Sequence, residues 1–240
     1  MEVVGKIQTG PTGTPHFFVK DPYGNLFQYI ESNNWFKNTK AHSGGPYGAI
    51  IGVSDLSKSK TFYKEILGYD KVLYEGKQTF EDLSNLPSGN LPLERCILTH
   101  SKKRTGPFSN MLGSSQIELW QVEGRNPIKI FDNRYWGDLG FIHLCFDIIG
   151  MDAMRKKCAS FGTPFTVDSA QAHLNGFDMG EAAGHFSYIE DPDGTLIEFV
   201  ETHKIPILKK LGWYLNLKKR DPHKPLPNFI LSALALNRVK

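Results

Sequence analysis

Hydrophobic and polar residues alternate most clearly over residues 195–201, directly after the sequence Asp-Pro-Asp-Gly at residues 191–194. Proline fixes φ and glycine accepts a positive φ, so this tetrapeptide predicts a tight turn, and the alternation after it predicts a β-strand. Side chains of a strand point alternately to two faces, which places Glu198 opposite Ile197 and Phe199. If these two apolar side chains pack on a helix, Glu198 points into the space that the sheet encloses.

The same turn and strand occur near the N-terminus, where residues 21–31 match residues 191–201 in type without a gap. Gln28 stands at the position that corresponds to Glu198. A strand, a capped helix and a terminating glycine also occur twice, over residues 50–68 and 142–162. Such internal repeats indicate that the chain is assembled from similar structural units.

Each complete repeat contains one helix and four strands in the order β-α-β-β-β. In the first repeat, Ser54 or Asp55 caps a helix that ends at Gly68. The expected strands are residues 47–53, 69–74, 95–100 and 116–122, and then 141–146, 165–168, 185–190 and 195–201. This order predicts an α+β fold in which tandem βαβββ modules form a curved mixed sheet around a cup, with the helices outside.

The pattern divides the chain into five segments. The two modules occupy residues 47–125 and 139–203, and residues 34–46 form a linker. Residues 1–33 provide the closing hairpin of an incomplete module, and residues 204–240 a basic helical tail. Because a bare hairpin is only marginally stable, we expect residues 1–33 either to belong to a longer four-module protein or to pair with another surface, as in a homodimer.

Charge is distributed unevenly along the chain. Residues 204–240 contain nine Lys or Arg and one acidic residue, a net charge of +8, which leaves −5 for residues 1–203 of a chain whose net charge is +3. Such a tail could dock on the acidic body, or meet a membrane surface, a nucleic acid or a phosphate-bearing substrate. Its basic residues are not interleaved with aromatic ones as in nucleic-acid-binding modules, so we expect no nucleic-acid partner.

Composition also bears on the compartment. The sequence lacks an apolar run long enough for a membrane span, and its first residues do not resemble a signal peptide. The three cysteines are an odd number without Cys-x-x-Cys spacing, which favours reduced thiols over disulfides or a thiolate zinc site. Together these features predict a cytoplasmic protein without a membrane span.

Strand alternation predicts which side chains line the cup. Glu118, His143 and Glu198 point inward from three different strands. Buried charges are costly without a partner. A divalent metal (Fe, Mn, Co, Ni or Zn) would provide one, since carboxylate oxygen and imidazole nitrogen suit these ions and three protein ligands leave positions open for substrate. The alternative is that His143 pairs with one of the glutamates.

The two repeats resemble the modules of the vicinal oxygen chelate superfamily, which includes glyoxalase I, bleomycin resistance proteins and extradiol dioxygenases. Residues 140–143 (Gly-Phe-Ile-His) and 191–198 are similar to the start and end of a glyoxalase-type module, and residues 53–68 to the helix of the preceding module. The resemblance covers residues 47–203 and extends to the hairpin at 12–33. It implies metal ligands in the first and last strands of both modules, at the positions of Gly48, Glu118, His143 and Glu198. Gly48 has no side chain to ligate with, so three ligands remain.

Three functions are compatible with this resemblance. The first is lyase or isomerase chemistry, in which a metal stabilises an enediolate of a small oxygenated substrate and Glu118 moves the proton on the adjacent carbon. The second is an extradiol-type ring-cleaving dioxygenase, whose pattern would require a histidine in place of Gly48. The third is a metal-free small-molecule binding or resistance protein, which the glycine at this position favours.

Further residues are candidates for the same site. His185 and His173 could provide an acid or a base at the mouth of the cup, or be surface histidines without such a role. Arg95 could hold a carboxylate or phosphate of the substrate, or belong to a solvated region. Trp120 and Phe141 are expected to form an apolar wall of the substrate pocket.

Overall fold

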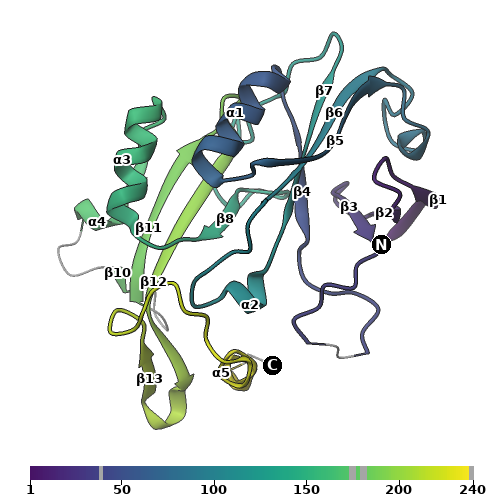
Figure 1. The fold of residues 1–240 in the computed structure, drawn as a ribbon. Coiled ribbons are helices and arrows are strands. Elements are labelled where there is room, and N and C mark those ends of the chain that lie inside the picture. Colours follow the sequence, from purple (N-terminus) through teal and green to yellow (C-terminus); the bar gives the residue numbers. More distant parts are fainter. Residues whose placement is uncertain (38–39, 173–176, 179–182, 238–240) are drawn as a thin grey trace. The chain divides into compact units, whose positions relative to one another are not determined.

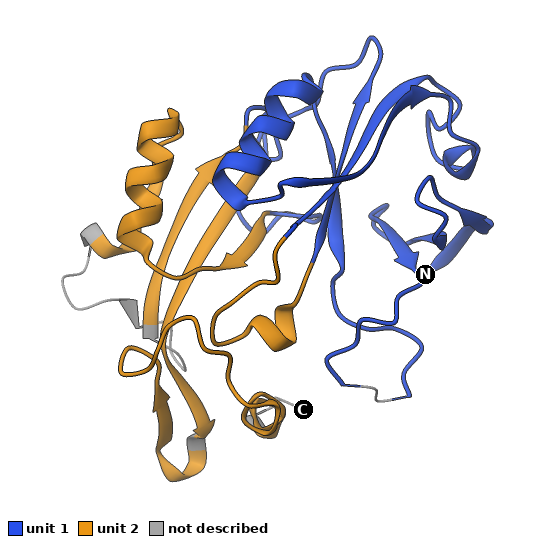
Figure 2. Cartoon of the chain, in the orientation of Figure 1, with its two compact units in different colours: residues 1–101, 115–142, 192–195 blue, residues 102–114, 143–191, 196–240 orange. Residues whose placement is uncertain are grey.

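The chain forms two compact units in a computed structural model that describes residues 1–37, 40–172, 177–178 and 183–237 (Figures 1 and 2). Unit 1 contains residues 1–101, 115–142 and 192–195, and unit 2 contains residues 102–114, 143–191 and 196–240. In the described parts of the chain, none of the helices has the length and apolar character needed to cross a membrane. Each unit is built around one βαβββ module.

The module of unit 1 is a four-stranded sheet. Its elements are β4 (Gly48–Gly52), α1 (Leu56–Leu67), β5 (Lys71–Gln78), the short helix η1 (Glu81–Leu83), β6 (Leu93–Thr99) and β7 (Gln116–Val122). The strand order is β4-β7-β6-β5, with the first strand parallel to the last. The Asp55 carboxylate accepts a hydrogen bond from the Lys58 amide at the start of α1, and Gly68 ends the helix in the left-handed region. Both helix boundaries are those that the sequence predicts.

The N-terminal hairpin is part of unit 1. Strands β1 (Glu2–Thr9), β2 (Pro15–Lys20) and β3 (Leu26–Ile30) form an antiparallel sheet of their own. Phe18 of β2 is 5% exposed and belongs to one buried cluster with Phe80, Leu83 and Leu93 of the module. The surface against which the hairpin packs is therefore provided by the adjacent module of the same chain.

The module of unit 2 repeats the plan of the first. It consists of β8 (Leu144–Asp147), α3 (Met151–Phe161), β9 (Val167–Asp168), β11 (Ala183–Glu190) and β12 (Leu196–Leu208), and α4 (Ser169–Ala172) and β10 (Phe177–Asp178) lie between β9 and β11 in the chain. Strand β8 is parallel to β12, while β11 is antiparallel to both β12 and β9. Two βαβββ modules are thus present, which confirms the predicted α+β fold class.

Residues 204–240 differ from the expected helical tail. Strand β12 continues to Leu208, and η2 (Lys209–Leu211) connects it to β13 (Trp213–Asn216), with which it pairs. Ile205 and Ile207 are buried, and the strand runs through Pro206 between them. The helices that follow are short: α5 (Asn228–Ala233) and η3 (Leu234–Asn237). Unit 2 also contains α2 (Ser109–Leu112).

Candidate functional site

Two of the predicted metal ligands meet in unit 2. His143 Nε2 lies 2.9 Å from Glu198 Oε2. The Tyr188 hydroxyl donates a hydrogen bond of 2.9 Å to the other carboxylate oxygen, Oε1, and the rings of His143 and Tyr188 pack edge to face. The His143 and Glu198 side chains are 22% and 16% exposed, so this group, which we call the inner site, is accessible to a small ligand.

Strand register explains this arrangement. Glu198 of β12 is the cross-strand partner of Tyr188 on β11 and of Cys145 on β8. Partners in neighbouring strands point to the same face, and His143, two residues before Cys145, continues that face. Ile197 and Phe199 are fully buried on the opposite face. Within this unit, Glu198 therefore points away from Ile197 and Phe199, as the alternation predicts.

Glu198 also influences the neighbouring acidic groups. Desolvation by the surrounding protein, and after it the Glu198 carboxylate, raises the pKa of the Cys145 thiol to about 12, although the residue is accessible. The same two causes raise the pKa of the Tyr188 hydroxyl. Both groups therefore stay protonated at neutral pH. Tyr188 acts here as a hydrogen-bond donor.

The third predicted ligand, Glu118, lies in a buried ion-pair network of unit 1. Its Oε1 accepts hydrogen bonds from Arg95 Nε and from Trp120 Nε1. Arg95 Nη1 donates in turn to Asp82 Oδ2 at 2.7 Å. Arg95 is 1% exposed, and Asp82 and Glu118 are buried with it. The guanidinium thus provides the positive charge that the sequence analysis assigns to a metal.

Residues from the hairpin and from the loop after β5 complete this network. His16 Nε2 of β2 lies 3.5 Å from Asp82 Oδ2, and His16 is 2% exposed. The Arg95 guanidinium stacks over the rings of Phe80 and Trp120 at 5.1 and 5.7 Å. Arg95 and Trp120, predicted as pocket residues, are therefore brought together with Glu118. Asp82 and His16 are not among the sequence candidates, because they lie outside the repeated strands.

The residues of the two units fit a divalent metal unequally. At the inner site, His143 Nε2 and Glu198 Oε2 are in direct ion-pair contact at 2.9 Å, the pairing given above as the alternative to a metal. Neighbouring ligands of an octahedral ion bound at about 2.1 Å are roughly 3 Å apart, so the same two atoms also fit such an ion. Glu118 does not fit, because it is paired with the buried Arg95 and its Oε1 accepts two hydrogen bonds. A metal at Glu118 would have to displace a buried ion pair.

Steric constraints require a glycine at position 48, the fourth ligand position of the family pattern. A Cβ atom added there would lie 2.0 Å from the Gln116 carbonyl oxygen, because β4 and β7 approach each other closely at this point. Real Cβ atoms do not approach a carbonyl oxygen so closely. A side chain of any kind, a ligating histidine included, would require the two strands to separate.

We therefore expect Gly48→Ala to lower the free energy of unfolding by about 1–3 kcal/mol, the range typical of overpacking. Gly52→Ala, in the same strand, is the matched control, since a Cβ at Gly52 would meet no atom within 4 Å. Urea unfolding of both variants measures the difference. Equal midpoints for the two variants would contradict this account of Gly48.

The remaining predicted residues lie elsewhere. His185 is the cross-strand partner of Glu201, three residues from the Tyr188–Glu198 pair, so it lies on the opposite face of the sheet from the inner site. Phe141 is 58% exposed and packs edge to face on Phe27 of the hairpin. His173 is outside the described residues.

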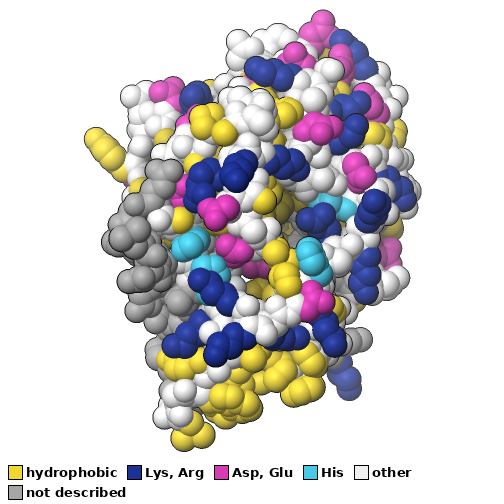
Figure 3. All heavy atoms as spheres, turned by 60° about the vertical axis from the view of Figure 1, so that its left-hand side comes forward, with side chains coloured by type: hydrophobic (Ala, Val, Ile, Leu, Met, Phe, Trp, Pro, Cys, Tyr) yellow, Lys and Arg dark blue, Asp and Glu magenta, His cyan; other side chains and the backbone are white. Residues whose placement is uncertain are grey.

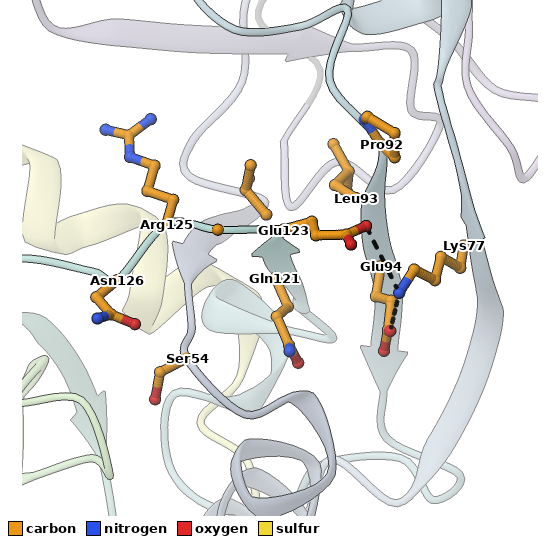
Figure 4. Close-up of a pocket in the computed structure, with 11 residues that line it drawn as sticks. Ser54, Lys77, Pro92, Leu93, Glu94, Gln121, Glu123, Arg125 and Asn126 are labelled. Atoms are coloured by element: carbon orange, nitrogen blue, oxygen red, sulfur yellow. Dashed lines mark ion pairs between the residues drawn. The ribbon is translucent and has the colours of Figure 1, made fainter.

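A surface pocket of about 370 Å³ lies in unit 1, beyond the ends of β6 and β7 (Figure 4). Its walls are mainly polar, and Lys77 pairs there with Glu94 at 3.1 Å and with Glu123 at 3.9 Å. None of the predicted site residues lines it. This pocket is therefore separate from the network around Glu118.

Comparison with known proteins identifies the modules. The family model of the Glyoxalase/Bleomycin resistance protein/Dioxygenase superfamily matches residues 47–199. The match covers both βαβββ modules and includes Glu118, His143 and Glu198. A search of curated proteins found no match.

Three similar solved structures belong to proteins named for this family or for one of its enzymes. A glyoxalase/bleomycin resistance protein/dioxygenase domain from Frankia sp. EAN1pec is 20% identical, with 67% of this chain and 98% of that chain covered and a TM-score of 0.44. A glyoxalase family protein from Bacillus cereus is 16% identical, with 69% and 99% covered and a TM-score of 0.48. A glyoxalase I mutant from Zea mays is 16% identical, with 83% and 59% covered and a TM-score of 0.47.

Proposed function

Because the chain belongs to the Glyoxalase/Bleomycin resistance protein/Dioxygenase superfamily, we propose that it is a metal-dependent lyase or isomerase acting on a small oxygenated substrate, with His143 and Glu198 as its reactive centre. The observation that supports this proposal is the convergence of the His143 imidazole and the Glu198 carboxylate at 2.9 Å on an accessible face of the second module. A divalent ion held by these two side chains would polarise a carbonyl oxygen of the substrate.

The chain's own residues then have defined roles. Tyr188 donates to Glu198 Oε1 and so fixes the carboxylate, which presents Oε2 on the side of His143. A carboxylate fixed in this way is suited to accept a proton from a carbon next to a carbonyl group. Glu118, which the sequence suggests as the base, is instead held by Arg95 and Trp120. We therefore assign the proton transfer to Glu198.

Proton exchange tests this function without knowledge of the product. The metal-loaded protein is incubated in D2O with a panel of small α-hydroxycarbonyl compounds, and deuterium at the carbon next to the carbonyl is measured by NMR or mass spectrometry. We expect incorporation into at least one compound, reduced about 100-fold or more in Glu198→Gln, because general-base catalysis typically contributes that much. Rates are compared at metal concentrations that saturate each protein, so that loss of the base is separated from loss of a metal ligand. Absence of incorporation throughout the panel, or equal incorporation by Glu198→Gln, would overturn the proposal.

A second candidate function is metal-free binding of a small molecule. The observation that favours it is the Glu118–Arg95–Asp82 network, in which a guanidinium stands in the module where the family pattern expects metal ligation. The two functions differ in their response to a chelator. Ligand binding that persists at full affinity after metal removal supports the second function, and binding that is lost supports the first.

A further inference from the structure

Three other side chains able to bind a metal gather on the opposite face of the unit 2 sheet. His185, Glu201 and His203 each offer one ligand atom, and these atoms all lie within 4.8 Å of one another. The rings of His185 and His203 are 4.8 Å apart between centroids. All three residues are partly exposed, so an ion could reach them from solvent. This group, which we call the outer cluster, shares no residue with the inner site.

The local strand structure brings the three side chains together. His185 on β11 and Glu201 on β12 are direct cross-strand partners. The next pairs are Gly184 with Thr202 and Ala183 with Lys204, so His203 is an extra residue on β12. This insertion is a β-bulge, a feature that changes the direction of a side chain and is frequent beside functional sites. The bulge turns His203 towards the His185–Glu201 pair.

The Glu201 carboxylate is held in place by backbone groups. Its Oε1 accepts a hydrogen bond of 2.7 Å from the Gly150 amide, and its Oε2 one of 3.3 Å from the Met151 amide, both at the start of α3. A ligating carboxylate is generally oriented by such hydrogen bonds. Glu201 therefore does not need to be ordered by the ion itself.

We propose that His185, Glu201 and His203 bind a divalent metal ion of the zinc class. Ligand atoms bound tetrahedrally at 2.0–2.1 Å are about 3.3 Å apart, and His203 Nε2 lies 3.5 Å from Glu201 Oε2. The His185 ligand atom lies within 4.8 Å of both. Two imidazoles and one carboxylate leave a fourth position open for water or for an oxygen of a ligand.

Metal titration of the full-length protein tests the outer cluster. The chain is purified without a histidine tag, stripped with a chelator and titrated with Zn(II), and Co(II) serves as a spectroscopic probe of the ligand set. The variants are His203→Ala and His185→Gln for the outer cluster and His143→Ala for the inner site. His42→Ala, in an exposed loop, is the matched control for adventitious histidine binding. Circular dichroism establishes that each variant is folded.

We expect His203→Ala and His185→Gln each to lower the affinity for one equivalent of Zn(II) by about 100-fold or more. This exceeds the loss expected for residues that merely support a ligand. This equivalent should persist in His143→Ala and His42→Ala. If Zn(II) binding by both outer-cluster variants equals that of the wild type, the outer cluster is only a cap for α3 and the proposal fails. If His143→Ala loses Zn(II) binding and the two outer-cluster variants do not, the outer cluster does not bind metal and the proposed function stands.

The end of unit 2 formed by the β12–β13 hairpin and α5 exposes large hydrophobic side chains. Leu211 and Trp213 at the hairpin tip are 79% and 54% exposed, and Phe229 of α5 is 72% exposed. In the view of Figure 3, hydrophobic side chains gather below a row of basic ones. Exposed basic residues near them in the sequence are Lys210, Lys218, Lys219 and Lys224.

We infer that this end of unit 2 binds the surface of an anionic lipid bilayer. Exposed Trp and Leu side chains insert at the boundary between head groups and acyl chains, and a row of lysines beside them attracts anionic lipids. A second copy of the chain fits less well, because the exposed lysines of one copy would repel those of the other. The expected orientation places the hairpin tip in the head-group region and the lysines above it.

Sedimentation with vesicles tests this inference. We expect the wild-type protein to bind vesicles of phosphatidylglycerol and phosphatidylcholine, and to bind at least about 30-fold more weakly when Lys218 and Lys219 are changed to glutamate. The double variant Leu211→Ser and Trp213→Ser should also lose binding, whereas Tyr135→Ser, which alters an 83% exposed aromatic residue of unit 1, should not. Two results would overturn the inference. One is that the wild-type protein does not bind anionic vesicles, and the other is that the lysine variant and the Leu211/Trp213 variant both bind as tightly as the wild type.

Discussion

Replacing Arg95 with methionine is expected to lower the free energy of unfolding by about 3–5 kcal/mol, the cost of leaving a buried charge without its partner. Arg95 is 1% exposed and donates to both Asp82 and Glu118. Methionine fills a similar volume but leaves these two carboxylates close together without a cation. Unfolding in urea, followed by tryptophan fluorescence, measures the change.

The matched control removes the charges as well as the cation. In a triple variant with Arg95→Met, Asp82→Asn and Glu118→Gln, the uncompensated charges are gone, and most of the lost stability should return. Equal stability of the Arg95→Met variant and the wild type would show that Arg95 is not the counter-ion of Glu118. Glu118 would then again be a candidate metal ligand.

Changing either residue of the inner site is expected to weaken divalent metal binding by about 100-fold or more, beyond the typical 10- to 100-fold loss for groups that only support a ligand. The variants are His143→Ala and Glu198→Gln, each made in a His203→Ala background so that the outer cluster does not contribute. Equilibrium dialysis against Mn(II), Ni(II) or Zn(II) gives the affinity. An unchanged affinity in either double variant, relative to His203→Ala alone, would exclude that residue as a ligand.

Much of the fold follows from local sequence signals. The turn at residues 191–194, the cap at Asp55 and the stop at Gly68 each depend on a few neighbouring residues, and their repetition defines the βαβββ order. Alternation within a strand gives the face of a side chain, and it correctly separates Glu198 from Ile197 and Phe199 in unit 2. These features depend on short-range geometry, which a single sequence contains.

Partners from distant parts of the chain are not visible in the sequence in this way. Arg95 and Glu118 lie on neighbouring strands, but Asp82 comes from the loop after β5 and His16 from the N-terminal hairpin. Alternation alone therefore predicts a charged residue facing inward without showing that an arginine neutralises it. The close approach of β4 to β7 at Gly48 is likewise a property of strand register.

The outer cluster is not evident from the sequence for a different reason. A bulge adds one residue to β12 at His203, and strict alternation does not predict where such a residue points. The available signal is the sequence Glu-Thr-His at residues 201–203, opposite a histidine on the preceding strand of the hairpin. The expectation that residues 204 onward are helical missed the same continuation of β12.

The proposed metal site consists of His143 and Glu198, without Glu118. It is tested most directly by comparing the Mn(II) affinity of Glu118→Gln with that of Glu198→Gln, both in the His203→Ala background. We predict that Glu118→Gln binds Mn(II) as tightly as the background, because that carboxylate is held in the buried ion pair with Arg95, while Glu198→Gln loses binding. Loss of Mn(II) in Glu118→Gln with retention in Glu198→Gln would contradict the account.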